Sequence, residues 1–473
     1  MRSLWNLALA YFASQIVRGV EIVQKVLIAN RGEIAVRIIR ACHDLGLQTV
    51  AVYSEADAEA MHVHHADEAI CIGPAQSMKS YLKIPNIIAA CEITGADAVH
   101  PGYGFLSENA NFASICESSG LTFIGPSSKS IALLGDKAMA KATAKSVKCP
   151  VIPGSEGIVH DVESGLKNAH KFGYPLFIKA VAGGGGKGIR IAFSDEDFVQ
   201  KFIQARTEAE ASFNNPDVYL ERMIVNPRHV EVQVVGDKYG NYIYLGERDC
   251  TIQRRRQKLI EEAPSPKVSD SLRKKMGQCA VEIVKAAHYQ SVGTVEFLLD
   301  EQGSFYFMEV NTRIQVEHTI TEELTGIDLV KQQICIARGE KLAHRQKDIT
   351  FNGHIFEFRI NAENPSQNFA PSPGQLEHYT PPGGPHVRVD SACYGGYKIS
   401  PHYDSMIAKL IVKGATREEA IAHAKRALKE FHIAGVHSTI PFHQYMLEDQ
   451  RFLTHNYTIG YIDQLISEGC NFT

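Results

Sequence analysis

The segment from Glu309 to Glu317 carries a polar side chain at every second position. These polar residues are Glu309, Asn311, Arg313, Gln315 and Glu317. Side chains of an extended segment alternate between two faces, so the spacing predicts that all of them project from one face. A strand carrying carboxylates, amides and a guanidinium in one row is costly unless ions or substrate occupy that surface. The segment is therefore predicted to form the floor of an active site.

A β-hairpin is predicted at the start of this row. Residues 294–300 and 304–310 are rich in β-branched and aromatic residues and flank a turn centred on Gln302-Gly303. Pairing across this turn places Glu296 opposite Glu309, and opposed carboxylates repel unless a cation lies between them. Hard oxygen ligands suit Mg²⁺ or Mn²⁺ that bridges substrate phosphates. The alternative is a pair of solvated carboxylates on an exposed strand.

A glycine-rich stretch, Gly183-Gly-Gly-Gly186-Lys187-Gly188, lies between two short apolar runs, residues 175–180 and 189–192. Glycines allow backbone N–H groups to approach a phosphate closely. The stretch is not a Walker A loop, because Gly188 follows Lys187 where Ser or Thr is required. A strand, glycine loop and strand predict a flap over a nucleotide, with Lys179 as the phosphate cation. A simple flexible hinge is the alternative.

The preceding and following regions predict the elements that hold these residues. Residues 26–29, 33–45 and 49–53 read as strand, helix and strand, a βαβ unit that lacks the Gly-x-Gly-x-x-Gly dinucleotide fingerprint. Alternating elements continue to about Gly125, a small α/β segment covers 151–221, and the rest is strand-rich with helices. The chain is therefore predicted to contain several α/β and α+β domains.

Composition excludes several classes of function. The chain has 473 residues, of which 44% are hydrophobic and 22% charged. Its net charge of -4 does not favour electrostatic binding to nucleic acid or to an anionic membrane. No segment approaches the roughly 20 uninterrupted apolar residues of a membrane span. The ten cysteines include no Cys-x-x-Cys pair, which argues against a zinc site or a disulfide framework. A reducing cytoplasm is the expected compartment.

The N-terminal extension is treated separately. Residues 1–20 contain no acidic residue and include an apolar stretch with the sole tryptophan, Trp5. A weak signal or transit peptide is one interpretation, but Asn6 interrupts the stretch and no clear cleavage site follows. An appended helix, or upstream sequence from an early start codon, is favoured.

Together these motifs resemble the ATP-grasp superfamily and, within it, biotin carboxylase, from Lys25 to the C-terminus. The resemblance rests on residues 28–34, 100–109, the glycine flap, 253–258 with 261–264, 309–318 and 358–363. It implies an ATP-grasp fold with a Rossmann-like N-terminal domain, a glycine-rich flap domain and a strand-rich C-terminal domain. The expected division is 1–22 (extension), 23–135, 136–222 and 223–473.

The resemblance also implies an activity. It implies ATP-dependent carboxylation of N1′ of biotin by bicarbonate through carboxyphosphate, with Mg²⁺ or Mn²⁺, as the first half-reaction of acetyl-CoA carboxylase in fatty acid synthesis. The implied partners are a biotin carboxyl carrier protein, carboxyltransferase subunits and a second copy in a homodimer. The chain ends at Thr473 without a biotinyl domain. The carrier is therefore expected to be a separate protein, and a component of a pyruvate or other acyl-CoA carboxylase is the alternative.

The resemblance assigns roles to individual residues. The expected nucleotide contacts are Lys137, Lys179, Gly185, Gly186, the hinge residues Glu221, Arg222 and Ile224, and His229. The expected metal ligands are Glu296, Glu309 and Asn311. Arg313, Gln315 and Val316 match the bicarbonate site, Lys258 a lysine near the γ-phosphate and bicarbonate, Glu317 the general base, and Arg359 the arginine that stabilises the biotin enolate.

One position departs from the family pattern. Arg256 stands where the family often has histidine; arginine keeps the donors for a nucleotide phosphate but puts any proton-shuttle role in doubt. The alternative for the basic run 254–258 is a solvated patch balanced by Glu261 and Glu262. Two other classes of protein remain as rivals: a different ATP-grasp ligase, which would not need Arg359, and a non-catalytic scaffold, which would be expected to lack a metal ligand or the base.

Overall fold

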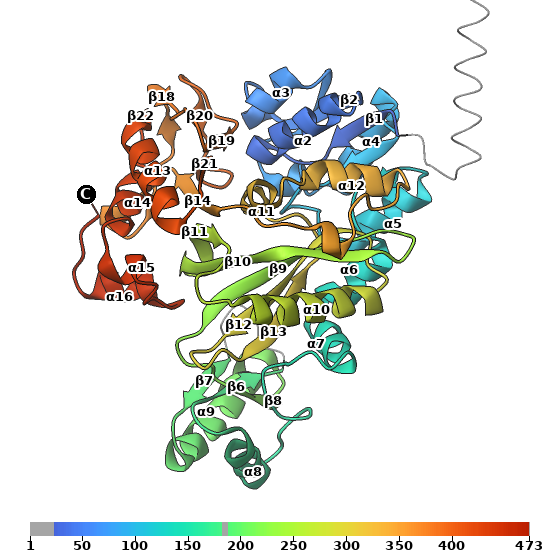
Figure 1. Ribbon diagram of the computed structural model, residues 1–473. Helices are drawn as coiled ribbons and strands as arrows, with labels where there is room; N and C mark the ends of the chain where they lie inside the picture. Colours follow the sequence, from blue (N-terminus) through green and yellow to red (C-terminus); the bar gives the residue numbers. More distant parts are fainter. Residues whose placement is uncertain (1–22, 182–187, 473) are drawn as a thin grey trace, which may run out of the picture.

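The computed structural model describes residues 23–181 and 188–472. Figure 1 shows two larger lobes in its upper part and a small flap at the bottom. Segments far apart in the chain meet between them: the N-terminal α/β domain lies against α12, and the C-terminal helices cover the far end of a long sheet. The N-terminal extension, Gly185 and Gly186 lie outside the described residues. No helix in the described part of the chain is long and apolar enough to cross a membrane.

The N-terminal domain is built on a parallel sheet with the order β3-β2-β1-β4-β5. Its strands are β1 (Lys25–Ile28), β2 (Gln48–Ser54), β3 (Glu68–Gly73), β4 (Ala98–His100) and β5 (Thr122–Phe123). Its helices are α2 (Gly32–Asp44), α3 (Met61–His65), α4 (Ile84–Thr94), α5 (Ala110–Ser118) and α6 (Ser128–Gly135). Val26 and Ile28 pack in one core and Leu27 in another, so β1 is buried on both faces. The predicted βαβ unit is confirmed.

The centre of the molecule is an antiparallel sheet with the order β13-β12-β9-β10-β11-β14-β21-β19. Its strands are β9 (Arg228–Gly236), β10 (Tyr242–Arg254), β11 (Gln257–Ala263), β12 (Ser291–Leu299), β13 (Phe305–Asn311), β14 (His354–Asn361), β19 (Val387–Ser391) and β21 (Met406–Gly414). Short two-stranded pairs accompany it: β15 (Glu363–Asn364) with β16 (Ala370–Pro371), β17 (Gly374–Gln375) with β20 (Lys398–Ile399), and β18 (His378–Thr380) with β22 (His432–Ala434). The strand-rich C-terminal part is therefore as predicted.

Helices cover both faces of this sheet. They are α7 (Lys137–Ser146), α10 (Asp270–Ala286), α11 (His318–Thr325), α12 (Leu329–Ala337), α13 (Arg417–Glu430), α14 (Ile440–Met446), α15 (Gln450–Leu453) and α16 (Tyr461–Ser467). Helix α10 begins after Ser269, whose hydroxyl accepts the Leu272 N–H. Its buried residues pack with Val230, Val232 and Val234 of β9. The alternate residues of β9 are left for the opposite face.

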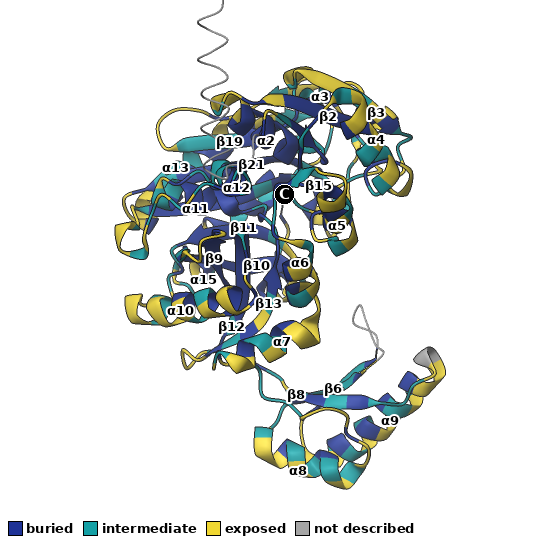
Figure 2. Cartoon of the chain, turned by 90° about the vertical axis from the view of Figure 1, so that its right-hand side faces the viewer, coloured by how far each residue is buried: buried dark blue, intermediate teal, exposed yellow. Residues whose placement is uncertain are grey.

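The flap is a small α/β unit that projects away from the rest of the molecule (Figure 2). It contains α8 (Val162–Phe172), α9 (Asp195–Phe213) and an antiparallel sheet of β6 (Leu176–Ala180), β7 (Ile189–Ala192) and β8 (Val218–Arg222), in the order β7-β6-β8. Lys179 pairs with Ile189 across β6 and β7. The two predicted strands that flank the glycine stretch are confirmed, while residues 182–187 lie outside the described residues.

The predicted hairpin and its register are also confirmed. Glu296 of β12 pairs with Glu309 of β13, and Gly303 in the connecting turn has a φ of +80°, which favours glycine. Phe297 pairs with Phe307, so Met308 is an extra residue between the two pairs. This bulge turns Glu309 away from the core face that Phe307 occupies.

The prediction of one extended row from Glu309 to Glu317 is wrong beyond Asn311. Strand β13 ends there, and Glu317 is the residue immediately before α11. The side chain of Glu108 causes the change of direction, because its carboxylate accepts hydrogen bonds from the Thr312 N–H at 3.0 Å and from Arg313 Nε at 2.9 Å. The polar side chains nevertheless reach one pocket, through a turn and a helix start rather than through a strand.

Candidate active site

A pocket of about 2130 Å³ lies where the N-terminal domain, the flap and the central sheet meet. Every predicted site residue that the structure describes lines it: Lys137, Lys179, Glu221, Arg222, Ile224, His229, Arg256, Lys258, Glu296, Glu309, Asn311, Arg313, Gln315, Val316, Glu317 and Arg359. The alternation of polar and apolar residues along β9 and β12 explains this arrangement. His229 and Glu296 leave the sheet on the face opposite the valines that α10 covers.

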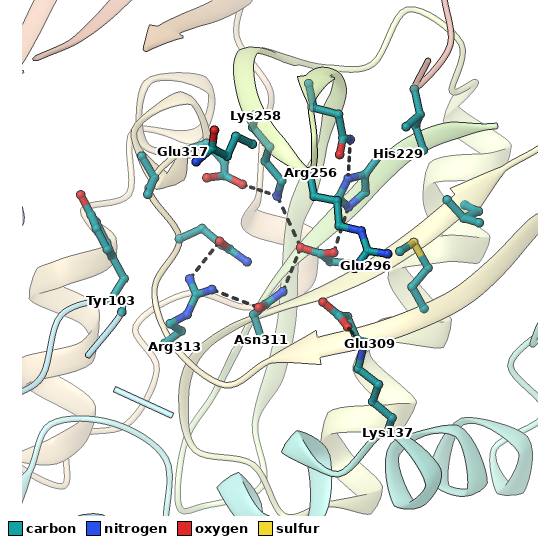
Figure 3. A pocket seen from close by; sticks show the side chains of 18 of the residues that line it. Tyr103, Lys137, His229, Arg256, Lys258, Glu296, Glu309, Asn311, Arg313 and Glu317 are labelled. Atoms are coloured by element: carbon teal, nitrogen blue, oxygen red, sulfur yellow. Dashed lines mark hydrogen bonds and ion pairs between the residues drawn. The ribbon is translucent and has the colours of Figure 1, made fainter. Parts of the chain in front are cut away.

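Glu296 lies at the centre of the pocket floor (Figure 3). Its carboxylate accepts hydrogen bonds from His229 Nε2 and Asn311 Nδ2, both at 2.9 Å, and lies 3.4 Å from Lys258 Nζ. The Gln253 amide donates to His229 Nδ1 at 3.1 Å, which leaves Nε2 to carry the proton toward Glu296. Burial would raise the pKa of Glu296, but Lys258 and His229 hold it well below the usual range. Glu296 is therefore ionised.

Lys258 connects three carboxylates. Its ammonium lies 2.7 Å from Glu231 and 2.6 Å from Glu317, in addition to its contact with Glu296. Burial would lower the pKa of Lys258, but Cys250 and these carboxylates raise it well above the usual value. The site thus holds a permanent cation in the wall of the pocket, as the transfer of a phosphoryl group requires.

Glu317 and Arg359 form the other end of the floor. Arg359 Nη2 donates to Glu317 Oε2 at 2.8 Å, and Arg359 Nε donates to Glu261 at 2.7 Å. Burial would raise the pKa of Glu317, but Lys258 and Arg359 hold it well below the usual range. As predicted, Arg359 shares a face of β14 with Glu357, while Phe356 and Phe358 fill the core on the other face.

Arg313 is oriented by its own neighbours. It donates to Gln315 Oε1 at 3.0 Å and to Asn311 Oδ1 at 3.1 Å, and Figure 3 shows Arg313 and Asn311 beside Glu296. With Glu108 on its Nε, each nitrogen of the guanidinium donates to a neighbouring side chain, which fixes its orientation. A cation and an amide held side by side suit a small planar anion.

The flap side of the pocket is lined by lysines. Lys141 Nζ lies 2.8 Å from Glu221, Lys179 also pairs with Glu221, and Lys137 lies 3.5 Å from Glu309. Burial would raise the pKa of Glu221, but Lys179 and Lys141 lower it. Lysines from α7 and β6 thus meet at the start of the hinge 221–224, which suits the phosphate chain of a nucleotide.

The basic run 254–258 forms a tight turn between β10 and β11. Arg255 and Arg256 have φ values of +49° and +68°, and Figure 3 shows the Arg256 side chain reaching over Glu296. Glu261 and Glu262 do not balance this run, because both glutamates are buried and pair elsewhere, with Arg359 and Arg417 respectively. Of the basic residues in the run, Arg256 and Lys258 line the pocket.

Two sets of side chains in the pocket contain carboxylates that could bind a metal ion. His229, Glu231 and Glu296 lie close enough to hold an ion. Lys258 and Arg248 already compensate Glu231, however, with contacts of 2.7 and 2.6 Å, so a further cation there would be repelled. Glu296, Glu309 and Asn311 supply oxygen ligands, and the Glu309 side chain is 38% exposed to the pocket. This second set fits Mg²⁺ or Mn²⁺ better.

Sequence reasoning missed several charged residues of the site. Glu231, fully buried, is bound by both Arg248 and Lys258, and Glu261 supports Arg359. The signal for Glu231 was present: His229, Glu231 and Gln233 alternate with valines along one strand. Lys141 carried no comparable signal, because its partner Glu221 lies 80 residues away in the chain.

Three family models match consecutive parts of the chain. They are "Biotin carboxylase, N-terminal domain" over residues 22–131, "Carbamoyl-phosphate synthase L chain, ATP binding domain" over 136–345, and "Biotin carboxylase C-terminal domain" over 357–464. The curated protein biotin carboxylase 1 of Bacillus subtilis is 55% identical over 442 residues, which are 93% of this chain and 98% of the relative. The chain belongs to the biotin carboxylase family. The resemblance read from the motifs is confirmed.

Solved structures of biotin carboxylases share the fold. The biotin carboxylase-beta-gamma-ATP complex from Campylobacter jejuni has a TM-score of 0.86 and 46% identity, over 94% of this chain and 99% of that one. The biotin carboxylase domain dimer of Hydrogenobacter thermophilus 2-oxoglutarate carboxylase, with MgADP and bicarbonate, has a TM-score of 0.85 and 49% identity, over 94% and 98%. The ATP-grasp architecture with a long antiparallel sheet is thereby confirmed.

Proposed function

We propose that this biotin carboxylase uses ATP and bicarbonate to carboxylate biotin on a carrier protein. The observation that supports this most directly is the row Lys258, Glu317 and Arg359, in which one carboxylate lies between two cations at 2.6 and 2.8 Å. A buried base held ionised beside a lysine and an arginine can activate a weakly nucleophilic anion. A different ATP-grasp ligase would not require this row.

The residues divide the reaction into two stages. In the first, Arg313, Gln315 and Val316 bind bicarbonate and Glu317 removes its proton, so that it attacks the γ-phosphorus of ATP and forms carboxyphosphate. Lys258, Lys137 and Lys179 neutralise the phosphate oxygens, and Arg256 adds donors from the turn. Glu221, Arg222, Ile224 and His229 are proposed to contact the nucleotide, with Gly185 and Gly186 of the flap.

In the second stage, biotin is deprotonated and attacks carbon dioxide. Carboxyphosphate breaks down to carbon dioxide and phosphate, and the phosphate takes the N1′ proton of biotin. Arg359 stabilises the negative charge that develops on the ureido oxygen through its N–H groups. Glu261 and Glu317 hold the guanidinium in place for this task.

Glu296, Glu309 and Asn311 are proposed to hold Mg²⁺ or Mn²⁺. A divalent cation bound there would neutralise charge on the phosphates of ATP. His229 and Lys258 orient the Glu296 carboxylate from its other side, which limits its freedom before the nucleotide arrives.

The assembly and compartment are also proposals. The match over 98% of a relative named biotin carboxylase supports a stand-alone subunit of acetyl-CoA carboxylase in fatty acid synthesis, with separate carrier and carboxyltransferase proteins. A homodimer is supported by the dimer of the Hydrogenobacter thermophilus domain. All ten cysteines are free thiols, which favours a reducing cytoplasm. Transfer from the carboxylated carrier to acetyl-CoA, measured against pyruvate, tests the acceptor.

ATP cleavage by the purified chain tests the central proposal. We expect ADP release that requires bicarbonate and is stimulated by biotin, with Mg²⁺ present. Cleavage that requires a different carboxylate and an amine would indicate another ATP-grasp ligase. Absence of cleavage with every combination, from a folded chain that still binds ATP, would indicate a non-catalytic subunit.

A further inference from the structure

Lys409 of β21 is a fully buried cation beneath the pocket floor that the proposed chemistry does not use. Its ammonium lies 3.1 Å from Glu33 Oε1 and donates to the backbone carbonyl of Val316 at 2.9 Å. Burial would lower the pKa of Lys409, but Glu33, Glu357 and Asp390 raise it, so the side chain remains charged. A charged donor therefore holds the residue that precedes Glu317.

Glu33 brings a second wall of the pocket to the same point. It belongs to α2 of the N-terminal domain and is 7% exposed. The Tyr103 hydroxyl donates to Glu33 Oε1, the same oxygen that faces Lys409, while Oε2 has no hydrogen-bond partner among the described residues. Tyr103 lines the pocket and lies at its edge in Figure 3. One carboxylate oxygen thus connects the N-terminal domain to the turn that carries Glu317.

Lys409 lies next to Arg359 in the sheet, and the two side chains hold the same turn of the pocket. The two residues pair directly across β21 and β14, so their side chains leave the same face. Arg359 reaches the carboxylate of Glu317, while Lys409 reaches the carbonyl of Val316. Neighbouring residues of the sheet therefore hold neighbouring residues of the turn 312–317.

We propose that Lys409 and Glu33 form a positioning pair, which fixes the turn 315–317 against the N-terminal domain so that it can receive bicarbonate. The inference rests on the proposed function. Without the donor from Lys409, the turn after β13 would lose its hydrogen bond at the Val316 carbonyl. Glu108 would still hold the start of the turn, and Lys258 and Arg359 would still hold the Glu317 side chain. Neither Lys409 nor Glu33 bonds to the proposed metal ligands on β12 and β13 or to the proposed nucleotide contacts of the flap in the described structure.

Substitution of Lys409 separates these two groups of contacts. In Lys409→Met we expect the KM for bicarbonate in ATP cleavage to rise at least roughly tenfold, while the KM for ATP stays within about twofold, because a hydrogen bond from a charged group to the turn is lost. The single variant leaves Glu33 buried without its cation, which lowers stability.

The double variant Glu33→Gln/Lys409→Met removes both charges of the pair. We expect it to regain thermal stability but to keep the raised KM for bicarbonate.

Lys413→Met is the matched control. Lys413 lies on the same strand and face, and its ammonium also donates to a backbone carbonyl, that of Glu323 at 2.8 Å, away from the turn 312–317. We expect unchanged KM values in this variant. The inference is overturned if the double variant regains the wild-type KM for bicarbonate, if both KM values rise together, or if Lys413→Met reproduces the effect. A wild-type chain without bicarbonate-dependent cleavage would instead overturn the proposed function, and this inference with it.

Discussion

Strands β11, β14 and β21 carry opposite kinds of surface on their two faces. On one face, Phe356, Phe358 and Leu410 form part of a large apolar core. The carboxylate of Glu262 on this side is bound by Arg417 and His354, both at 2.8 Å, and by the Tyr457 hydroxyl. Burial would raise the pKa of Glu262, but these partners hold it well below the usual range. The charge on this face is fully satisfied.

The pocket face of the same strands is arranged differently. Glu261, the neighbour of Glu262 in β11, and Glu357 in β14 pair directly across the sheet. Both are buried, and one oxygen of each, Glu261 Oε2 and Glu357 Oε1, has no partner among the described residues. Burial raises the pKa of Glu261 to about 7. This face holds charges in an arrangement that is poor for stability.

The difference between the two faces indicates that one face of the sheet stabilises the fold and the other carries the functional residues. Unsatisfied buried carboxylates cost free energy and persist where surrounding structure holds them, which is typical of functional sites. The apolar face supplies that support, because its aromatic residues alternate with the charged ones along the same strands. Substitutions on the pocket face should therefore change activity, and those on the opposite face should change stability.

The largest expected effect is that of Arg359→Ala. We expect loss of biotin carboxylation by about a thousandfold or more, with appreciable bicarbonate-dependent ATP cleavage, because Arg359 acts after carboxyphosphate forms. Carboxybiotin formation and ADP release are measured in parallel. Equal loss of both activities would show that Arg359 acts before phosphoryl transfer.

Glu309→Gln and Glu296→Gln test the metal site on the same face. Each removes one charged oxygen ligand, so ATP turnover should fall by at least roughly a hundredfold while the fold survives. The Mg²⁺ concentration for half-maximal turnover should rise in both variants. A profile unchanged from wild type in both would exclude the hairpin as the metal site.

Glu262→Gln tests the opposite face. Breaking this buried ion pair should lower the free energy of unfolding by about 3 kcal/mol at pH 7. The folded pKa of Glu262 is depressed, so its contribution is present above the unfolded pKa of ~4.3 and is lost as the pH falls below that value. In thermal unfolding between pH 7 and pH 3, the difference in unfolding midpoint between wild type and Glu262→Gln should shrink as the pH falls. At low temperature, ATP cleavage by the folded variant should be within about threefold of wild type.

Glu261→Gln should give the opposite pH dependence. The folded pKa is raised to about 7, so wild type loses stability as the pH rises from ~4.3 toward that value. The variant lacks this loss. Its free energy of unfolding relative to wild type should therefore increase between pH 5 and pH 8 by about 1–3 kcal/mol, which is measured as a rise in its relative unfolding midpoint. A constant difference across this range would show that Glu261 is ionised throughout, and the contrast between the faces would fail.

The contrast between the faces also explains what could be predicted from sequence. The hairpin register and the strand of Arg359 followed from alternation and a glycine turn, which are local properties. The turn from Asn311 to Glu317 could not be predicted, because Glu108, some 204 residues earlier in the chain, redirects it. Lys409 and Glu33 act through contacts between distant segments, and a single charged residue in an apolar strand gives no sign of its partner.

The smallest expected effect is that of Arg256→His. The position has a φ of +68°, which histidine tolerates better than most residues, and both side chains can donate to a phosphate. ATP cleavage at neutral pH should therefore change by no more than about threefold.

Lys258→Ala should reduce ATP cleavage far more, because Lys258 contacts Glu231, Glu296 and Glu317 at once and no other cation shares that position in the described structure. The pH profile decides whether position 256 meets the nucleotide: a new limb near ~6.5, the usual pKa of histidine, is expected in Arg256→His. Identical profiles in wild type and Arg256→His, together with an active Lys258→Ala, would place the basic turn outside the chemistry and leave Glu317 and Arg359 as the functional part of the pocket face.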